Sequence, residues 1–150
     1  MKELPGKILF IDDEEYEKIL LEEALTDKNW NVQIEYFSST SQALEYLRET
    51  EDNIFIIISD INMPKMNGLD FKRIIDQDRS LHQKSIPFIF ASNAATREQV
   101  EEAYRYRVQG YFQKPRGEAK QAEMLDIILK YWMINQHPNI QDIPYDIPFD

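Results

Sequence analysis

Short hydrophobic runs alternate with segments of helical periodicity along the whole chain. Five such runs predict β-strands, at residues 7–11, 32–37, 54–58, 87–91 and 111–113. Residues 54–58 are apolar at every position, which is typical of a central strand covered on both faces. After each run, apolar side chains recur every three or four positions, and this spacing predicts helices. Three of these helices carry Leu20 and Ala24, Leu44 and Leu47, and Phe71 and Ile75; the last two span residues 96–107 and 119–135.

The order of these elements predicts the fold class. Strands that alternate with helices are typical of an α/β fold, here a five-stranded parallel sheet that is doubly wound, with helices on both of its faces. The chain has 150 residues, the length of one ordinary domain. We expect that domain to span residues 1–135.

Residues 136–150 depart from the alternation and form an acidic, proline-rich tail. An Asp-Ile-Pro-aromatic sequence occurs at 142–145 and again at 146–149. Proline at this density excludes a helix, so we expect an extended segment. The sequence leaves one alternative open, in which the tail docks on a partner or on the domain's own surface.

Charge and residue content exclude several classes of protein. Lys and Arg number 17 against 27 Asp and Glu, a net charge of −10, so we expect no direct binding to a nucleic acid, whose phosphates carry the same sign. The absence of cysteine excludes disulfides, Cys-ligated zinc and thiol nucleophiles. No apolar run is long enough to cross a bilayer and the N-terminus lacks a signal-peptide pattern, so we expect a cytoplasmic protein without membrane insertion.

Polar side chains follow the predicted strands at the points where ligands bind in open parallel sheets, beyond the carboxyl ends of the strands. Asp12 and Asp13 follow the first strand, Asp60 the third, Ser92 the fourth and Lys114 the fifth. Taken singly, each has an ordinary structural explanation, as a helix cap, a turn former or a solvated charge. Together they place three carboxylates, one hydroxyl and one ammonium at one sheet edge.

Carboxylates crowded at one edge repel one another unless a cation neutralises them. An oxygen-only set with room for water and a phosphate oxygen suits Mg²⁺. No His or Cys stands among these residues to favour a softer metal, and no G-x-x-x-x-G-K loop is present to wrap the phosphates of a nucleotide. The sequence therefore predicts a magnesium site that takes a single phosphoryl group.

The same residues stand in a recognisable order. It comprises the pair Asp12-Asp13, the D-x-x-M-P-x-M-x-G segment at 60–68, Ser92, Tyr111 and Lys114-Pro115, each after the expected strand. Over residues 7–131 this order resembles the receiver domain of two-component response regulators. The resemblance implies a flavodoxin-like three-layer sandwich and a stand-alone, single-domain response regulator.

The resemblance implies a phosphoacceptor and a metal site. Asp60 would take a phosphoryl group from a phosphohistidine, on a sensor histidine kinase or a histidine phosphotransfer protein. Mg²⁺ would be held by Asp12, Asp13, Asp60 and the backbone carbonyl of Asn62, and no other cofactor is expected. A metal ion and an ammonium group agree with the chemistry, because phosphoryl transfer needs its equatorial charge neutralised.

Three further residues receive roles by resemblance. Lys114 would supply the catalytic ammonium group, and the family's usual cis Lys114–Pro115 peptide would direct it into the site. The Ser92 hydroxyl would bond the new phosphoryl group, and Tyr111 would turn inward with it, so that these two form the switch. The role of Tyr111 depends on family spacing alone, because an aromatic on a short strand is more often a core residue.

The sequence also departs from the family pattern at three places. Ser59 replaces the usual apolar residue before the acceptor, and Asn93 stands where a small residue is usual. Arg107-Val108 replaces a common Gly-Ala, which removes a glycine able to adopt positive φ. None of these changes removes a chemical group, but we expect an altered turn at Arg107.

We expect a phosphoacceptor signalling domain that is no enzyme beyond self-catalysed phosphotransfer and autodephosphorylation. With no output module after residue 135, the signal would leave by contact with an unidentified output protein. That contact would use the face formed by residues 96–107, 111–113 and 119–135, or the tail. The same face could support a homodimer.

Two alternatives belong to other classes. A phosphatase of the haloacid dehalogenase type also uses an aspartate after a strand, but its D-x-D pattern is absent because Asn62 stands two residues after Asp60. A pseudo-receiver, which binds proteins without being phosphorylated, is the second alternative. The crowded carboxylates count against it, because a scaffold has no need of them.

Overall fold

The computed structural model describes residues 1–141; the expected repeats at 142–149 lie outside the described residues. Five strands form one parallel sheet in the order β4-β2-β5-β6-β7. Their bounds are β2 (Lys7–Ile11), β4 (Ile34–Phe37), β5 (Ile54–Ser59), β6 (Phe88–Ser92) and β7 (Gly110–Gln113). All six residues of the central strand β5 are buried, as its uninterrupted apolar sequence predicts. The predicted α/β fold is confirmed.

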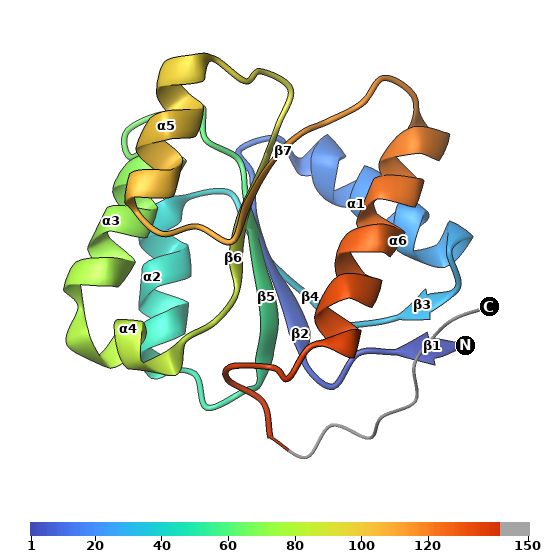
Figure 1. Ribbon diagram of the computed structural model, residues 1–150, viewed down its shortest axis with the longest axis horizontal. Helices are drawn as coiled ribbons and strands as arrows, with labels where there is room; N and C mark the ends of the chain where they lie inside the picture. The colour runs from blue at the N-terminus through green and yellow to red at the C-terminus, as the bar shows by residue number, and fades with distance from the viewer. Residues whose placement is uncertain (142–150) are drawn as a thin grey trace.

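Helices cover both faces of the sheet (Figure 1). One face carries α1 (Glu15–Asp27) and α6 (Glu118–Ile134), and the other carries α2 (Thr40–Glu49), α3 (Gly68–Gln77), α4 (Arg79–Lys84) and α5 (Arg97–Arg105). Alternate residues of β2 supply the two cores: Leu9 and Ile11 pack towards α2 and α3, and Ile8 and Phe10 towards α6. The sheet is thus the middle of three layers.

Side-chain caps fix where three of the helices begin. The Ser39 hydroxyl accepts from the backbone N–H of Gln42, Asn67 from that of Asp70, and Thr96 from that of Gln99. Each bond satisfies an N–H group that the first helical turn leaves without an internal partner. Asn67 belongs to the loop after Asp60, so its cap also fixes the end of that loop.

Helix α4 was not predicted, because six residues are too few to show helical periodicity. Asp78 ends α3 and begins α4, where its Oδ1 accepts from the N–H groups of Ser80 (3.1 Å) and Leu81 (3.2 Å). The helix ends at Ser85, which has a φ of 51°. Lys84 then reaches across to the last turn of α2 and donates to the carbonyl of Leu47 at 2.7 Å.

The predicted strand at 32–37 is shorter than expected and begins at Ile34. Trp30–Asn31 form a separate strand, β3, which pairs in parallel with β1 (Lys2–Glu3) outside the main sheet. The indole N–H of Trp30 donates to Asp126 on α6 at 2.8 Å, and Lys2 pairs with the same carboxylate at 3.0 Å. These polar contacts turn the segment towards α6 and away from the sheet edge.

In the turn before β7, Arg107 adopts the left-handed backbone conformation that glycine would adopt easily. Arg107 has a φ of 61°, so the altered turn expected from the loss of glycine at this position is wrong. The side chain of Arg107 is exposed. Val108, the next residue, is buried in the core.

Beyond α6 the chain stays in contact with the sheet. His137 accepts at Nδ1 from the N–H groups of Asn139 (3.1 Å) and Ile140 (3.0 Å), and its Nε2 lies 2.7 Å from the carbonyl oxygen of Phe55. Ile140 is buried in the same core as Phe55. The boundary expected at residue 135 therefore precedes a short segment that packs on β5.

Candidate functional site

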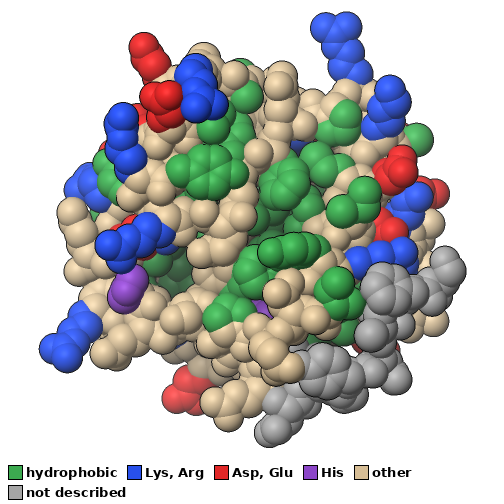
Figure 2. Space-filling view, viewed as in Figure 1, with side chains coloured by type: hydrophobic (Ala, Val, Ile, Leu, Met, Phe, Trp, Pro, Cys, Tyr) green, Lys and Arg blue, Asp and Glu red, His purple; other side chains and the backbone are tan. Residues whose placement is uncertain are grey.

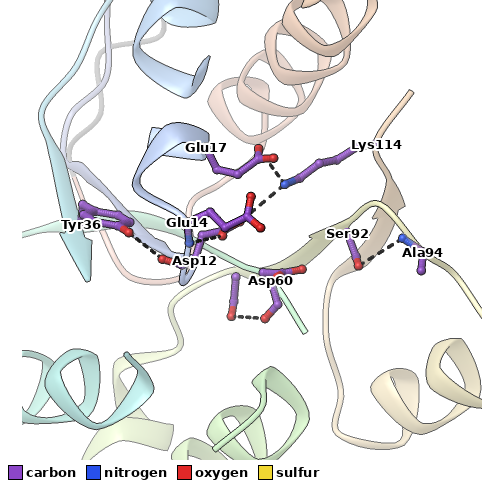
Figure 3. Close-up of polar contacts among 9 residues, drawn as sticks. Asp12, Glu14, Glu17, Tyr36, Asp60, Ser92, Ala94 and Lys114 are labelled. Atoms are coloured by element: carbon purple, nitrogen blue, oxygen red, sulfur yellow. Dashed lines mark hydrogen bonds and ion pairs between the residues drawn. The ribbon is translucent and has the colours of Figure 1, made fainter. Parts of the chain in front are cut away.

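The predicted polar residues gather at the carboxyl edge of the sheet (Figure 3). Asp12 follows β2, Asp60 follows β5, and Lys114 follows β7, while Ser92 is the last residue of β6. The strands are parallel, so their carboxyl ends lie at one edge. The structure thus brings together residues that are up to 102 positions apart in the chain, the separation of Asp12 and Lys114.

Three carboxylates form the centre of the site. Asp12, Asp13 and Asp60 each offer an oxygen atom within 4.8 Å of the other two. Asp12 is buried, Asp60 is half-buried and Asp13 is exposed, so the cluster opens to solvent on the Asp13 side. The structure therefore brings together the three carboxylates of the predicted ligand set, and their role as metal ligands stays a prediction.

Asp12 is held from two sides. Its Oδ1 accepts from the backbone N–H of Glu14 at 3.0 Å, and its carbonyl accepts from the Tyr36 hydroxyl at 2.7 Å. Burial raises the pKa of Asp12 to about 6, although the Glu14 N–H and the Lys114 ammonium group favour the charged form. Because burial disfavours the charged form of Asp12, a cation bound beside this carboxylate would stabilise it.

Asp60 stands on a tightly fixed backbone. Its N–H donates to the carbonyl of Ile11 at 2.9 Å, and its own carbonyl accepts from the Ser59 hydroxyl at 2.8 Å. Ser59, which replaces the family's usual apolar residue, is fully buried, and its hydroxyl has a hydrogen-bond partner in the next residue. Burial raises the pKa of Asp60, whereas the N–H of Ile61, the Lys114 charge and the Ser92 hydroxyl lower it.

Lys114 faces two carboxylates, one of which was not predicted. Its Nζ lies 3.0 Å from Glu17 Oε2 and 3.6 Å from Asp12 Oδ2. The Lys114–Pro115 peptide is trans, so the expected cis peptide is wrong. The trans form is the preferred state of an X–Pro bond, and in it the lysine still reaches the site.

Glu17 is the site residue that sequence reasoning missed. It lies in the first turn of α1, where acidic residues are common because they complement the helix dipole. No local sequence pattern marked Glu17, because its partner Lys114 is 97 residues away in the chain.

Ser92 and Tyr111 are both close to the edge. Ser92 is 1% exposed, and its Oγ accepts from the N–H of Ala94 at 3.4 Å. The Tyr111 hydroxyl donates to the carbonyl of Ala94 at 2.9 Å, and its ring packs against Phe90. Both expected switch residues are thus bonded to the same loop after β6. Their movement remains a prediction.

Asn62 links the loop after Asp60 to α5. Its side-chain oxygen accepts from the Gln99 amide at 3.3 Å. Asn62 also lies two residues after Asp60, in the loop whose backbone would supply the predicted carbonyl ligand. The contact connects the loop after Asp60 directly to α5.

The donor set suits one class of metal ion. Within residues 1–141, the clustered groups able to bind a metal are all carboxylates. Mg²⁺ prefers oxygen ligands and is bound by few protein groups. The buried Asp12, whose pKa is raised by burial, supplies a reason for a cation to bind here.

Comparison with known proteins identifies the family. Residues 8–129 match the family described as "Response regulator receiver domain". The chain belongs to this family. Receiver domains of two-component systems are phosphoacceptors, and phosphorylation and Mg²⁺ are general features of the family.

Related sequences and structures agree. The chemotaxis protein CheY-3 of Vibrio cholerae is 32% identical over 124 residues, which cover 83% of this chain and 92% of that protein. The CheY of Pseudomonas aeruginosa is 32% identical over 109 residues, or 73% of this chain and 84% of its own. The structure of the phosphorylated cyanobacterial phytochrome response regulator RcpA superposes with a TM-score of 0.76 at 22% sequence identity. The match covers 86% of this chain and 94% of that one, and at this identity it supports the fold alone.

The receiver domain retains every group of the expected set. Asp12, Asp13, Asp60, Ser92 and Lys114 are all at the carboxyl edge, so nothing among the described residues favours the pseudo-receiver alternative. In residues 1–141, moreover, the helices are too short or too polar to serve as a membrane span.

Proposed function

We propose that Asp60 is the phosphoacceptor of this receiver domain. The observation that carries the proposal is the position of its carboxylate, within 4.8 Å of those of Asp12 and Asp13 and facing the Ser92 hydroxyl. The Lys114 charge also acts on Asp60 and favours its ionised form. Asp60 is the one member of the cluster that follows the central strand.

The reaction needs an ionised carboxylate as nucleophile. An Asp60 oxygen would form a bond to the phosphorus of a phosphohistidine as the P–N bond breaks, and the imidazole would leave with the electron pair and take a proton from solvent. Burial raises the pKa of Asp60, and Lys114 and Ser92 oppose this rise and so favour the ionised form, which is the form that can attack. The product is an acyl phosphate on Asp60.

Asp12, Asp13, Asp60 and the Asn62 carbonyl are the groups that we propose hold Mg²⁺. When bound, the ion neutralises charge on the transferring phosphoryl oxygens. The residues of the chain do the remaining work. Ser92, buried beside Asp60, can donate its hydroxyl hydrogen to a new phosphoryl oxygen, and Tyr111 is positioned to follow because it shares the Ala94 loop.

We assign the output contact to the face formed by α5, β7 and α6. Figure 2 shows hydrophobic side chains gathered between α5 and α6 on this side. Ile127, Tyr131 and Ile134 are all exposed and recur at helical spacing on α6, and Tyr104 is exposed on α5. A surface of this kind fits an output protein or a second copy of the receiver domain. The upstream partner would be a histidine kinase or a histidine phosphotransfer protein.

Intact mass after incubation with acetyl phosphate and Mg²⁺ tests the acceptor. The wild type should gain one phosphoryl group only with Mg²⁺, and Asp60→Asn should gain none while keeping the fold, because the change preserves shape and removes one repelling charge. Asp27→Asn, at the exposed end of α1, is the matched control and should be labelled as the wild type is. A labelled Asp60→Asn protein would show that the acceptor is another residue.

A further inference from the structure

Lys114 is paired away from the proposed acceptor in this structure. Among the described residues it forms two ion pairs, with Glu17 at 3.0 Å and Asp12 at 3.6 Å, and none with Asp60 within 4.0 Å. Figure 3 shows its side chain directed to Glu17. The exposed fractions of the three side chains are 9% for Lys114, 15% for Glu17 and 3% for Asp12, so solvent and salt screen these pairs only weakly.

Glu17 reaches the ammonium group because of its place on α1. The helix begins at Glu15, and the N–H of Glu17 donates to the carbonyl of Glu14 at 3.0 Å. Glu15, two residues earlier in the same turn, is exposed and has no ion pair in the described part of the chain. One helical turn therefore presents one carboxylate to Lys114 and another to solvent.

The surroundings leave room for this pair to separate. Glu17 and Lys114 line a cavity of about 350 Å³ between α1 and α6, whose floor is formed by sheet residues such as Ile58. In a close-packed interior, movement of a buried lysine would displace its neighbours. Both side chains line this cavity, so a change of rotamer there displaces fewer neighbours.

We infer that Glu17 is a positioning residue that competes with Asp60 for Lys114, and that it holds the lysine until Asp60 carries a phosphoryl group. This inference rests on the proposed function of Asp60. A phosphoryl group brings about two negative charges to Asp60, against the single charge of Glu17, so the ammonium group then moves to the acceptor side. Glu17 sets how strongly the lysine is drawn back.

Removal of the competing charge should change the lifetime of the phosphorylated state. In Glu17→Gln, Lys114 loses a resting partner and pairs more firmly with the phosphoryl group on Asp60, where its charge assists transfer of that group to water. We expect the phosphorylated protein to lose the group about fivefold faster than the wild type, which is near the upper end of what one ion pair contributes. Glu15→Gln removes the same charge from the same helical turn and should leave the lifetime unchanged. Glu17→Asp keeps the charge and should restore most of the wild-type behaviour.

The experiment phosphorylates each protein with acetyl phosphate and Mg²⁺, removes the donor, and follows the loss of the phosphoryl mass with time. A second readout is the NMR signal of the Lys114 ε-methylene group, which a purely structural role for Glu17 would not move. In the wild type this signal should shift when beryllium fluoride, a phosphoryl mimic, is added. In Glu17→Gln it should already be displaced before the addition.

Two negative outcomes are distinguishable. If the wild type takes up no phosphoryl group on Asp60, the proposed function fails and this inference fails with it. If the wild type is labelled, but Glu17→Gln and Glu15→Gln lose the group at the wild-type rate and the Lys114 signal stays in place, this inference alone is overturned. If Glu17→Gln does not fold, Glu17→Ala, which also removes the carboxylate, takes its place in both measurements.

Discussion

At the scale of single residues, one ammonium group, that of Lys114, interacts with several carboxylates at the carboxyl edge of the sheet. Lys114 is the cation that contacts Asp12 and Glu17 and acts at longer range on Asp60. Burial raises the pKa of both Asp12 and Asp60, so the local charge is costly without a cation. The stability of these buried carboxylates therefore depends on the position of Lys114 as well as on metal binding.

Replacement of this lysine should separate metal binding from switching. Lys114→Ala retains all three carboxylates, so Mg²⁺ should still bind in a calorimetric titration. The variant lacks the ammonium group that would pair with a phosphoryl oxygen, so beryllium fluoride should shift the NMR signals of α5 and β7 much less than in the wild type. Equal shifts in the two proteins would count against the role of Lys114.

A second residue-scale prediction concerns His137. Burial lowers its pKa below the ordinary 6.5, and its Nδ1 accepts two backbone N–H groups, so the folded protein favours the neutral ring. The unfolded chain then binds more protons below pH 6.5, and the stabilisation by His137 is present above that pH and declines as the pH falls towards the lowered pKa. His137→Ala should reduce the free energy of unfolding by about 2 kcal/mol at pH 7.5, through lost buried hydrogen bonds.

Urea unfolding at pH 7.5 and pH 5.5 measures this effect. The difference between wild type and His137→Ala should be smaller at pH 5.5. His82→Ala, on the exposed surface of α4, is the control and should cost little at either pH. A His137→Ala difference that is the same at both pH values would exclude the proposed link to protonation.

At the scale of helices and strands, the sequence predicted what long periodic patterns encode. The strand at β5 and the helices α2, α5 and α6 lie within a few residues of their predicted positions, because apolar spacing and caps such as Ser39 define them. Short elements escaped prediction. The six-residue helix α4 depends on the Asp78 cap, and β3 depends on a contact between Trp30 and Asp126, 96 residues away, which no local pattern records.

Gly68 shows how one element supports the site. A Cβ atom at this first residue of α3 would clash with the carbonyl oxygen of Asp60 and lie 3.0 Å from Cα of Ile61. Both are backbone atoms and cannot simply turn aside. Gly68→Ala should therefore lower the free energy of unfolding by about 2 kcal/mol and slow phosphorylation by acetyl phosphate, because Asp60 must shift. If Gly68→Ala had the same urea midpoint and the same rate of phosphorylation as the wild type, the close approach of the two backbone segments would not require glycine.

At the scale of the whole molecule, the sequence predicted which residues share the site but not how they pair. Parallel strand order alone places Asp12, Asp13, Asp60, Ser92 and Lys114 at one edge, and each is found there. The Glu17 partner, the trans peptide before Pro115 and the packing of Ile140 on the core depend on three-dimensional neighbours. Periodicity carries no information about such contacts. The carboxyl edge of the sheet is joined to α5 and β7 through the loops after β5 and β6, where Gln99 contacts Asn62 and Tyr111 contacts Ala94.

The central claim is that Asp60 carries the phosphoryl group, and direct mapping of the modified residue tests it most directly. The wild-type protein is incubated with acetyl phosphate and Mg²⁺ and treated with borohydride, which reduces an acyl phosphate on aspartate to homoserine. Peptide mass spectrometry should then find homoserine at position 60, with Asp12 and Asp13 unchanged. Homoserine at another aspartate, or at none, would contradict the account.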